Sequence, residues 1–363
     1  MEKITIRDIA NQAGVSVATV SRAINPHTSR FVRTSTRSKI LRLVKRTNYL
    51  PSPVAKRLAT GKSTNIVIFL STRYTSIFYS DYYTKLLSGA MSVLENTNYN
   101  LIVRMLKHTE YQFTLNKVVR GMDIAATIIC DFLDMLQVSL SGLENVRMPV
   151  VILNRTERKE GVTFMAVDNF KGGYDATNHL VQLGHRKIGI VKGTYYEKDM
   201  IDRFEGYKKA LADNFIPIND AYVFEGDFTE KTGFKAVEYL MALKDRPTAI
   251  FCTNDEIAIG AFMQLDSMGV RCPKDVSLMG FDGLDTGRYL VPKLTSMTLP
   301  ITEIAQEAVR ALLCALEGKR EMGELRIFEA TLFKGGTCGR PPSRAASGAG
   351  TGTMPHKRTS GGS

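Results

Sequence analysis

The stretch GVSVATVSRAIN, residues 14–25, combines one guanidinium group, at Arg22, with hydroxyl side chains and small apolar residues. An arginine side chain can donate two hydrogen bonds to O6 and N7 of a guanine base in the major groove of DNA. Hydroxyl groups suit phosphate oxygens, which orient a protein on DNA without reading its sequence. These residue types are those of a nucleic-acid-reading surface, and an ordinary buried helix is the alternative interpretation.

The charge of the chain is concentrated around this stretch. Residues 1–62 contain thirteen Lys or Arg and two acidic residues, Glu2 and Asp8, so they hold +11 of the chain's net +12. A basic module favours an anionic polymer as its partner, because neutralising phosphates releases counterions. From charge alone, a solvated basic face or a membrane-surface patch remains the alternative.

Two short helices joined by a tight turn would position these side chains. Thr5 can cap a first helix, Gly14 supplies the backbone freedom of a sharp turn, and Ser16 can cap a second helix running to about Ile24. The side of the second helix that can pack inward carries Val20, Ala23 and Ile24. The opposite side, narrow enough for a major groove, carries Ala18, Ser21 and Arg22, and Val17 lies on the boundary, where it could contact DNA or pack partly in the core. A third helix is expected over residues 34–47, with Ile40, Leu41 and Val44 as its apolar stripe.

The segment YLPSPVAKRLATGKS, residues 49–63, predicts a fourth, short helix. Ser52 and Pro53 suit its start, and Gly61 ends it. A helix of about eight residues is marginal in isolation. It therefore needs a partner, such as its own copy in a dimer or a DNA groove.

From Asn65 onward, short apolar runs alternate with longer amphipathic segments, which is typical of βαβ units and parallel sheets. The runs are too many for one sheet, so we expect two α/β lobes. Ligands of such sheets bind at the carboxyl ends of strands. The polar residues that follow predicted strands include Ser71, Asn154, Asn254 and Asp282. Each could bind a small polyhydroxylated ligand or could instead cap the next helix.

The stretches TIRDIANQAGVSVATVSRAIN and NYLPSPVAKRLATGKS resemble the head and hinge of the lactose-repressor (LacI/GalR) family of bacterial transcription regulators. The strings VDNFKGGYDATNHLVQLGHRKIG, DRFEGYKKAL, TNDEIAIGAF and GFDGLDTGRYLVPKLTSM resemble its regulatory domain, so the resemblance covers roughly residues 3–338. One departure follows Asn25, where PHTSRFVRTSTR is about two residues longer than usual and has Arg33 in place of a common Ser.

This resemblance implies a homodimer that binds a near-palindromic double-stranded DNA operator. Val17, Ala18 and Arg22 would read the major groove, while paired hinge helices would insert Leu58 into the minor groove. The full set of expected DNA-contacting residues is Thr5, Ser16, Val17, Ala18, Thr19, Ser21, Arg22, Asn25, Tyr49, Val54, Ala55 and Leu58.

The resemblance also implies a small-molecule effector, expected to be a sugar, bound between two periplasmic-binding-protein-like lobes and controlling operator affinity. The expected effector-binding residues are Ser71, Phe78, Asn154, Arg203, Phe228, Asn254 and Asp282. Asp168 would lie near the lobe junction, with a structural role or a ligand contact. A nucleobase or a phosphorylated metabolite is the alternative effector, and a stand-alone sugar-binding protein is the alternative function.

The predicted organisation is an all-α helix-turn-helix head and hinge followed by a two-lobed α/β domain. Its segments are the head 1–50, the hinge 51–63, a first lobe 64–162 and 294–322, a second lobe 163–293 and 323–338, and a disordered low-complexity tail 339–363.

Enzymatic function finds little support in the motifs. The chain contains no GxGxxG after its first strand, no P-loop, no HExxH and no GxSxG, so we expect no catalytic site, cofactor or metal. Five scattered Cys without a CxxC pair, together with an N-terminus MEKITIRDIA lacking a long apolar run, predict a cytoplasmic protein with reduced thiols and no membrane partner.

Overall fold

The computed structural model describes residues 4–24, 28–49, 63–71, 80–106, 123–130, 148–193 and 198–342. The chain forms two compact units that divide between Ser63 and Thr64. Within the described residues, no helix is both long enough and apolar enough to cross a membrane.

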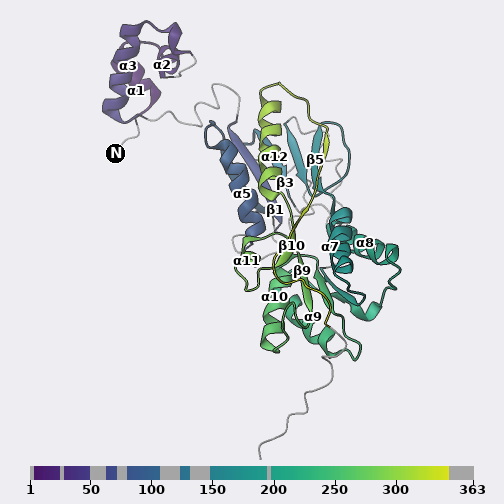
Figure 1. Cartoon of the computed structure of the whole chain (residues 1–363). Coiled ribbons are helices and arrows are strands. Elements are labelled where there is room, and N and C mark those ends of the chain that lie inside the picture. The colour runs from purple at the N-terminus through teal and green to yellow at the C-terminus, as the bar shows by residue number, and fades with distance from the viewer. Residues whose placement is uncertain are drawn as a thin grey trace, which may run out of the picture. The chain divides into compact units, whose positions relative to one another are not determined.

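The described residues of the first unit form helices α1, α2 and α3 around a small apolar core (Figure 1). The helical segments are α1 (Ile6–Ala13), α2 (Val17–Ile24), the 3-10 turn η1 (Ser29–Phe31) and α3 (Thr34–Thr47). The core consists of Ile9, Ala10, Ala13, Val20, Ala23, Ile40, Leu43 and Tyr49. On α3 the apolar stripe is therefore Ile40, Leu43 and partly buried Val44. The prediction of Leu41 was wrong, because this side chain is 40% exposed.

The second unit has two six-stranded sheets (Figure 1), which confirms the predicted two-lobed α/β fold. The first sheet has the order β11-β5-β4-β3-β1-β2 and is parallel throughout. Its strands are β1 (Asn65–Ser71), β2 (Asn100–Leu106), β3 (Ala126–Ile129), β4 (Val150–Leu153), β5 (Val162–Val167) and β11 (Leu325–Phe328). Helices α5 (Asp81–Leu94) and α12 (Ile301–Leu316) pack on each other and on this sheet.

The second sheet has the order β12-β10-β9-β8-β6-β7, and its edge strand β12 is antiparallel to β10. Its strands are β6 (Ile188–Lys192), β7 (Val223–Glu225), β8 (Ala249–Cys252), β9 (Ser277–Asp282), β10 (Thr295–Thr298) and β12 (Thr331–Phe333). Helices α7 (Asn169–Gln182) and α8 (Lys198–Asp213) lie on one side of the sheet, and α9 (Glu230–Ala242) and α10 (Asp255–Ser267) lie on the other (Figure 1). The 3-10 turn η5 (Asp220–Tyr222) precedes β7, and the short helix α11 (Asp285–Arg288) follows β9.

The strand pairings correct the predicted lobe boundaries. Strands β5 and β11 belong to the first sheet, although residues 163–167 and 325–328 were assigned to the second lobe. Strand β10 belongs to the second sheet, although residues 295–298 were assigned to the first lobe. The chain therefore changes lobes after these strands rather than before them, because each strand completes the sheet of the lobe that it leaves.

The predicted tail begins too early. The backbone carbonyl of Gly339 accepts a hydrogen bond from the buried ring of His185 at 2.9 Å, and the Gly339 N–H donates to Ser277 Oγ at 3.0 Å. Residues 339–342 thus continue the ordered body. Residues 343–363 lie outside the described part of the chain.

Candidate functional site

The first two helices of the head are fixed by local hydrogen bonds. The Thr5 hydroxyl oxygen accepts from the Asp8 N–H at 3.4 Å, and the Thr5 N–H donates to Asp8 Oδ2 at 2.8 Å, which together cap α1. Gly14 then adopts a left-handed conformation with φ of 71°. The sharp turn between α1 and α2 therefore follows from residues that are adjacent in the sequence.

Helix α2 presents one face to the core and one to the surroundings. Val20 and Ala23 are buried, whereas Val17 is 41% exposed. The other exposed residues of the outer face are Ala18, Ser21 and Arg22. The structure therefore brings the three expected base-reading residues of α2, Val17, Ala18 and Arg22, together with the Ser21 hydroxyl on one accessible surface.

The hydroxyl groups expected to contact DNA also have structural roles. Thr5 belongs to the cap of α1, and the Ser16 Oγ accepts from the Thr19 N–H at 3.2 Å to begin α2. Tyr49 is only 7% exposed and packs in the head core, where burial raises the pKa of its phenol. Its ring is thus a core residue, and only its hydroxyl could serve a DNA contact.

Helix α3 contacts the carboxyl end of α1 through a side-chain hydrogen bond. Lys39 Nζ donates to the carbonyl oxygen of Ala13 at 2.8 Å, which satisfies an unpaired carbonyl at the end of α1. Arg33, at the position where the family commonly has Ser, precedes α3 and makes no side-chain cap. Helix α3 therefore begins without a side-chain cap and with a cation next to its first turn.

Several expected contact residues lie outside the described chain. They are Asn25, Val54, Ala55 and Leu58 of the DNA-contacting set, and Phe78 of the effector-binding set. For Ser71, the structure describes only the backbone, at the end of β1.

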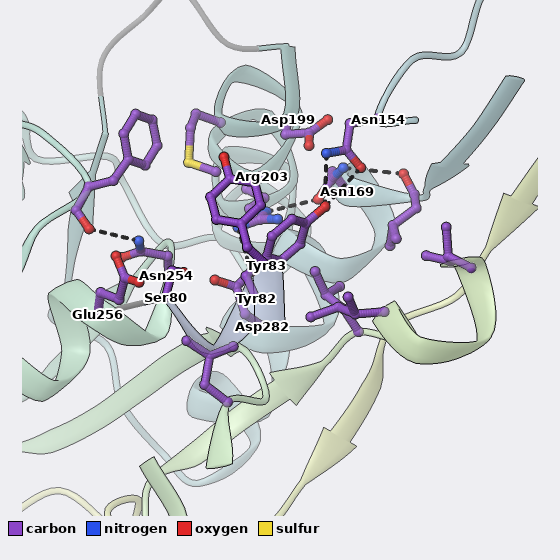
Figure 2. A pocket seen from close by; sticks show the side chains of 17 residues that line it. Ser80, Tyr82, Tyr83, Asn154, Asn169, Asp199, Arg203, Asn254, Glu256 and Asp282 are labelled. Atoms are coloured by element: carbon purple, nitrogen blue, oxygen red, sulfur yellow. Dashed lines mark hydrogen bonds and ion pairs between the residues drawn. The ribbon is translucent and has the colours of Figure 1, made fainter. Parts of the chain in front are cut away.

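A pocket lies between the two lobes of the second unit, at the carboxyl ends of their strands (Figure 2). The first lobe contributes Ser80, Tyr82, Tyr83, Asn154, Val167, Ile301 and Ile304. The second lobe contributes Asn169, Asp199, Met200, Arg203, Phe228, Asn254, Glu256, Asp282, Leu284 and Leu299. All the charged side chains among these described residues come from the second lobe, whereas the first lobe supplies hydroxyl, amide and apolar groups.

Arg203 is the centre of the polar network and is only 4% exposed. Its Nε donates to Asn169 Oδ1 at 2.8 Å, and one terminal nitrogen donates to the Thr253 carbonyl and lies 3.3 Å from Asp282 Oδ1. The guanidinium carbon also lies 3.8 Å from the centre of the Phe281 ring. These contacts fix the cation in place before any ligand arrives.

Asp282 ends β9 with an unusual backbone, because its φ is 114°. The neighbouring turn is held by Asp255, which accepts hydrogen bonds from the Leu284 N–H at 2.7 Å and from Ser296 Oγ at 2.6 Å. Burial raises the pKa of both carboxyls to about 7, while Arg203 opposes that rise. Asp255 is thus a buried support for the residue that meets the pocket.

The Asn254 side chain hydrogen-bonds two backbone groups of the second lobe. Its Oδ1 accepts from the Ile257 N–H at 2.9 Å and caps α10, while its Nδ2 donates to the Phe228 carbonyl at 3.0 Å (Figure 2). The capping role considered from the sequence is therefore present, and the same side chain positions Phe228 in the pocket wall. Asp168 is likewise a cap, since its Oδ1 accepts from the Lys171 N–H at 2.8 Å.

Asn154 connects the pocket to α5. Its Nδ2 donates to the Tyr82 hydroxyl at 3.0 Å, and its backbone has a positive φ of 62° (Figure 2). Every expected effector residue with a described side chain therefore lines one pocket: Asn154, Arg203, Phe228, Asn254 and Asp282.

Sequence reasoning did not assign several polar members of this pocket. They are Ser80, Tyr82, Asn169, Asp199 and Glu256. Asn169 adjoins Asp168, and Glu256 lies two residues after Asn254; the sequence did single out Asp168 and Asn254, which was the available signal. Ser80 and Tyr82 begin a helix, where no strand-end rule applies.

A contact between the lobes was also missed. Lys85 on α5 donates to the Gly283 carbonyl at 3.0 Å and lies 3.3 Å from Asp285. On the same helix, Asp81 Oδ2 accepts from the Thr286 N–H at 3.0 Å. We call these four residues and Gly283 the interlobe latch, because they join α5 of the first lobe to the turn and α11 of the second.

A helix-turn-helix head followed by a two-lobed body with a pocket at the strand ends defines a class of protein, the ligand-responsive transcription regulators. Residues 5–52 match the family described as bacterial regulatory proteins, lacI family, and residues 177–338 match the periplasmic binding protein-like domain. ExuR of Bacillus subtilis (strain 168), described as a probable HTH-type transcriptional repressor, is 32% identical over 330 residues, which cover 91% of this chain and 96% of ExuR. The chain belongs to the lacI family of bacterial regulatory proteins and is a DNA-binding transcription regulator.

Solved structures agree with the fold. The lac repressor dimer bound to operator and the anti-inducer ONPF has a TM-score of 0.81 and 24% identity, and the match covers 93% of this chain and all of that one. A sugar-binding transcriptional regulator of the lacI family from Escherichia coli, complexed with phosphate, has a TM-score of 0.65 and 25% identity over 77% of this chain and all of that one.

Proposed function

We infer that the chain acts in the cytoplasm as a homodimeric repressor that binds a near-palindromic operator, and that a sugar bound in the interlobe pocket changes its affinity for that operator. The observation that carries the DNA-binding part is the exposed face of α2, where Arg22 projects from a helix whose opposite face is locked into the head core. The name of the ExuR relative as a repressor supports the direction of regulation.

The two halves of the molecule suit different parts of this function. The head offers Val17 and Ala18 for contact with thymine methyl groups and Arg22 for guanine, with hydroxyl groups nearby for phosphates. The pocket offers convergent amide, hydroxyl and carboxylate groups with aromatic walls, which suits a ligand whose hydroxyls donate and accept. The roles are binding roles, with no catalytic step assigned to any residue.

Effector control requires the pocket and the operator to influence each other through the lobes. The interlobe latch and the pocket are formed by the same two lobes, so a ligand that prefers one lobe arrangement changes the balance between arrangements. By linkage, the operator must change effector affinity by the same factor.

The decisive experiment is selection of operator sequences from a random DNA library, followed by fluorescence anisotropy on the selected duplex. We expect a near-palindromic sequence, binding that weakens as salt rises, and a shift in affinity when a bound sugar is added. Equal affinity for selected and scrambled duplexes would overturn the DNA-binding part. An operator affinity unaffected by any ligand that binds the pocket would overturn the coupling.

A further inference from the structure

The chain between α2 and α3, which is longer here than is usual for the family, has a defined structure before α3 begins. We call residues 28–32 the α2–α3 turn. The Phe31 N–H donates to the Thr28 carbonyl at 3.0 Å, and the Val32 N–H donates to the Ser29 carbonyl at 3.1 Å. Ser29 is buried, and partly buried Val32 packs against the head core. The turn is therefore anchored on the head through these two residues.

The two side chains between these anchors lie outside the core. Arg30 is exposed, and Phe31 is 67% exposed, although burial of an aromatic ring is favourable. The guanidinium carbon of Arg30 lies 4.9 Å from the centre of the Phe31 ring, which is a cation–π contact. This contact orients the guanidinium group in advance, and so reduces the entropy that the group loses when it binds a partner.

The turn is also joined to the helix that we propose reads DNA. The Thr28 hydroxyl donates to the backbone carbonyl of Arg22, in the last turn of α2, at 3.2 Å. This carbonyl is one of those that the end of a helix leaves without an intrahelical partner. The hydrogen bond therefore fixes the turn beside the end of α2 that carries Arg22.

The electrostatics of this region favour an anionic partner. The sequence has no Asp or Glu between residues 9 and 80, and the Asp8 carboxylate is hydrogen-bonded by Thr5 in the cap of α1. Arg22 and Arg30 are both exposed. A guanidinium group can donate two parallel hydrogen bonds to a phosphate, and phosphates are the groups that duplex DNA presents beside its grooves.

We propose that the α2–α3 turn is a second DNA contact of the head, in which Arg30 binds a backbone phosphate beside the groove read by α2 and Phe31 positions the guanidinium group. The inference rests on the proposed function of α2 in reading an operator. It adds a contact that sets affinity and salt dependence without reading bases, through two residues outside the expected DNA-contacting set.

The test is fluorescence anisotropy of the full-length protein on the selected operator and on its single-base variants, at several salt concentrations. Arg30→Ala should weaken binding by about fivefold or more at about 0.1 M salt, to the same extent for every duplex. The slope of the logarithm of affinity against the logarithm of salt concentration should fall in magnitude by about 1, because one phosphate fewer is neutralised.

Two substitutions of Phe31 test its positioning role. Phe31→Leu removes the ring but keeps an apolar side chain, so operator affinity should fall by about two- to fivefold while the salt slope stays nearly unchanged. Phe31→Tyr keeps the ring and should bind the operator more tightly than Phe31→Leu. Equal affinities of these two variants would overturn the role of Phe31.

The matched control is Arg46→Ala, which removes the same charge from an exposed site in the last turn of α3. Arg46 lies about 18 Å along the helix axis from Thr34, at the end of α3 away from the turn. It should weaken binding less than Arg30→Ala. An effect of Arg30→Ala no larger than that of Arg46→Ala would overturn the contact, and a loss confined to one base pair would overturn its assignment to the backbone.

The outcomes separate this inference from the proposed function. A wild-type protein that selects no operator would count against the proposed function. A selected operator bound equally well by the wild type and by Arg30→Ala would count against the turn alone. Because Arg30 and Phe31 are exposed, the head of each variant should keep its fold, and an unchanged ranking of the single-base variants verifies this.

Discussion

Arg22 in the head and Arg203 in the pocket are the same residue type used in opposite ways. Arg22 is exposed on the outer face of α2, and its environment leaves the side chain accessible to a partner. Arg203 is 4% exposed and is bound to three acceptors of its own lobe. The outer face of α2 thus keeps its recognition groups separate from the head core, whereas the pocket builds its recognition groups into the core of its lobe.

The difference follows from the kind of ligand. DNA meets the head from outside, so α2 needs only a rigid inner face and an accessible outer face. A small molecule must be enclosed, so the polar groups that meet it are themselves desolvated and must satisfy one another in its absence. Substitutions on the outer face of α2 should therefore change binding alone, and substitutions in the pocket should change stability as well.

The sharpest test of this contrast replaces both arginines. Arg203→Ala leaves the Asp282 carboxylate buried without its cation, and we expect it to lower the free energy of unfolding by about 3–5 kcal/mol. Arg22→Ala should change it by no more than about 0.5 kcal/mol, as for other exposed sites. Urea unfolding of the two full-length variants measures both. Equal losses of stability would remove the distinction between the two regions.

Base reading by Arg22 should produce the next largest effect. Arg22→Ala should reduce discrimination between the best operator and its variants at one base pair by about 1–3 kcal/mol, because the bidentate contact to guanine is lost. Arg42→Ala, an exposed arginine on α3, serves as the matched control and should affect all sequences alike. Anisotropy titrations on a set of single-base variants distinguish these outcomes. A uniform loss with Arg22→Ala would assign Arg22 to the DNA backbone.

The interlobe latch should give a smaller effect. Lys85→Met keeps the aliphatic part of the side chain but removes its contacts to Gly283 and Asp285. The ion pair between Lys85 and Asp285 is partly exposed, and such pairs contribute about 0–1 kcal/mol. We expect the ratio of operator affinities with and without effector to change by up to about fivefold. Lys209→Met, which breaks a pair within α8, should leave that ratio unchanged. Identical ratios in both variants would show that the latch does not bias the lobes.

The stability of the protein should also depend on pH. The pKa of Glu256 is raised to about 7 in the folded protein, so its contribution to stability is fully present below its unfolded pKa of about 4.5 and is lost as the pH rises through about 7. Glu256→Gln should therefore lose less stability than the wild-type protein between about pH 5 and pH 7.5. Parallel thermal unfolding curves across that range measure the difference, and superimposable pH profiles would contradict it.

The sequence alone determined the head and the fold class. Thr5, Gly14 and Ser16 act through hydrogen bonds and backbone angles within a few residues, so the two helices and their turn could be predicted from local patterns. The predicted third helix, residues 34–47, is also confirmed, since it was predicted from the spacing of its apolar residues. The alternation of apolar runs and amphipathic segments likewise predicted parallel sheets in two lobes, since it depends only on periodicity.

The tertiary structure alone decided to which lobe strands β10 and β11 belong and which side chains line the same pocket. Strands β10 and β11 are short and flanked by chain crossings, so their partners are set by long-range pairing and not by their own residues. Glu256 meets Ser80 and Asp282 although these residues are far apart in the chain. Their proximity, and with it the raised pKa of Glu256, exists only because the two lobes form one cavity and remove its polar groups from water.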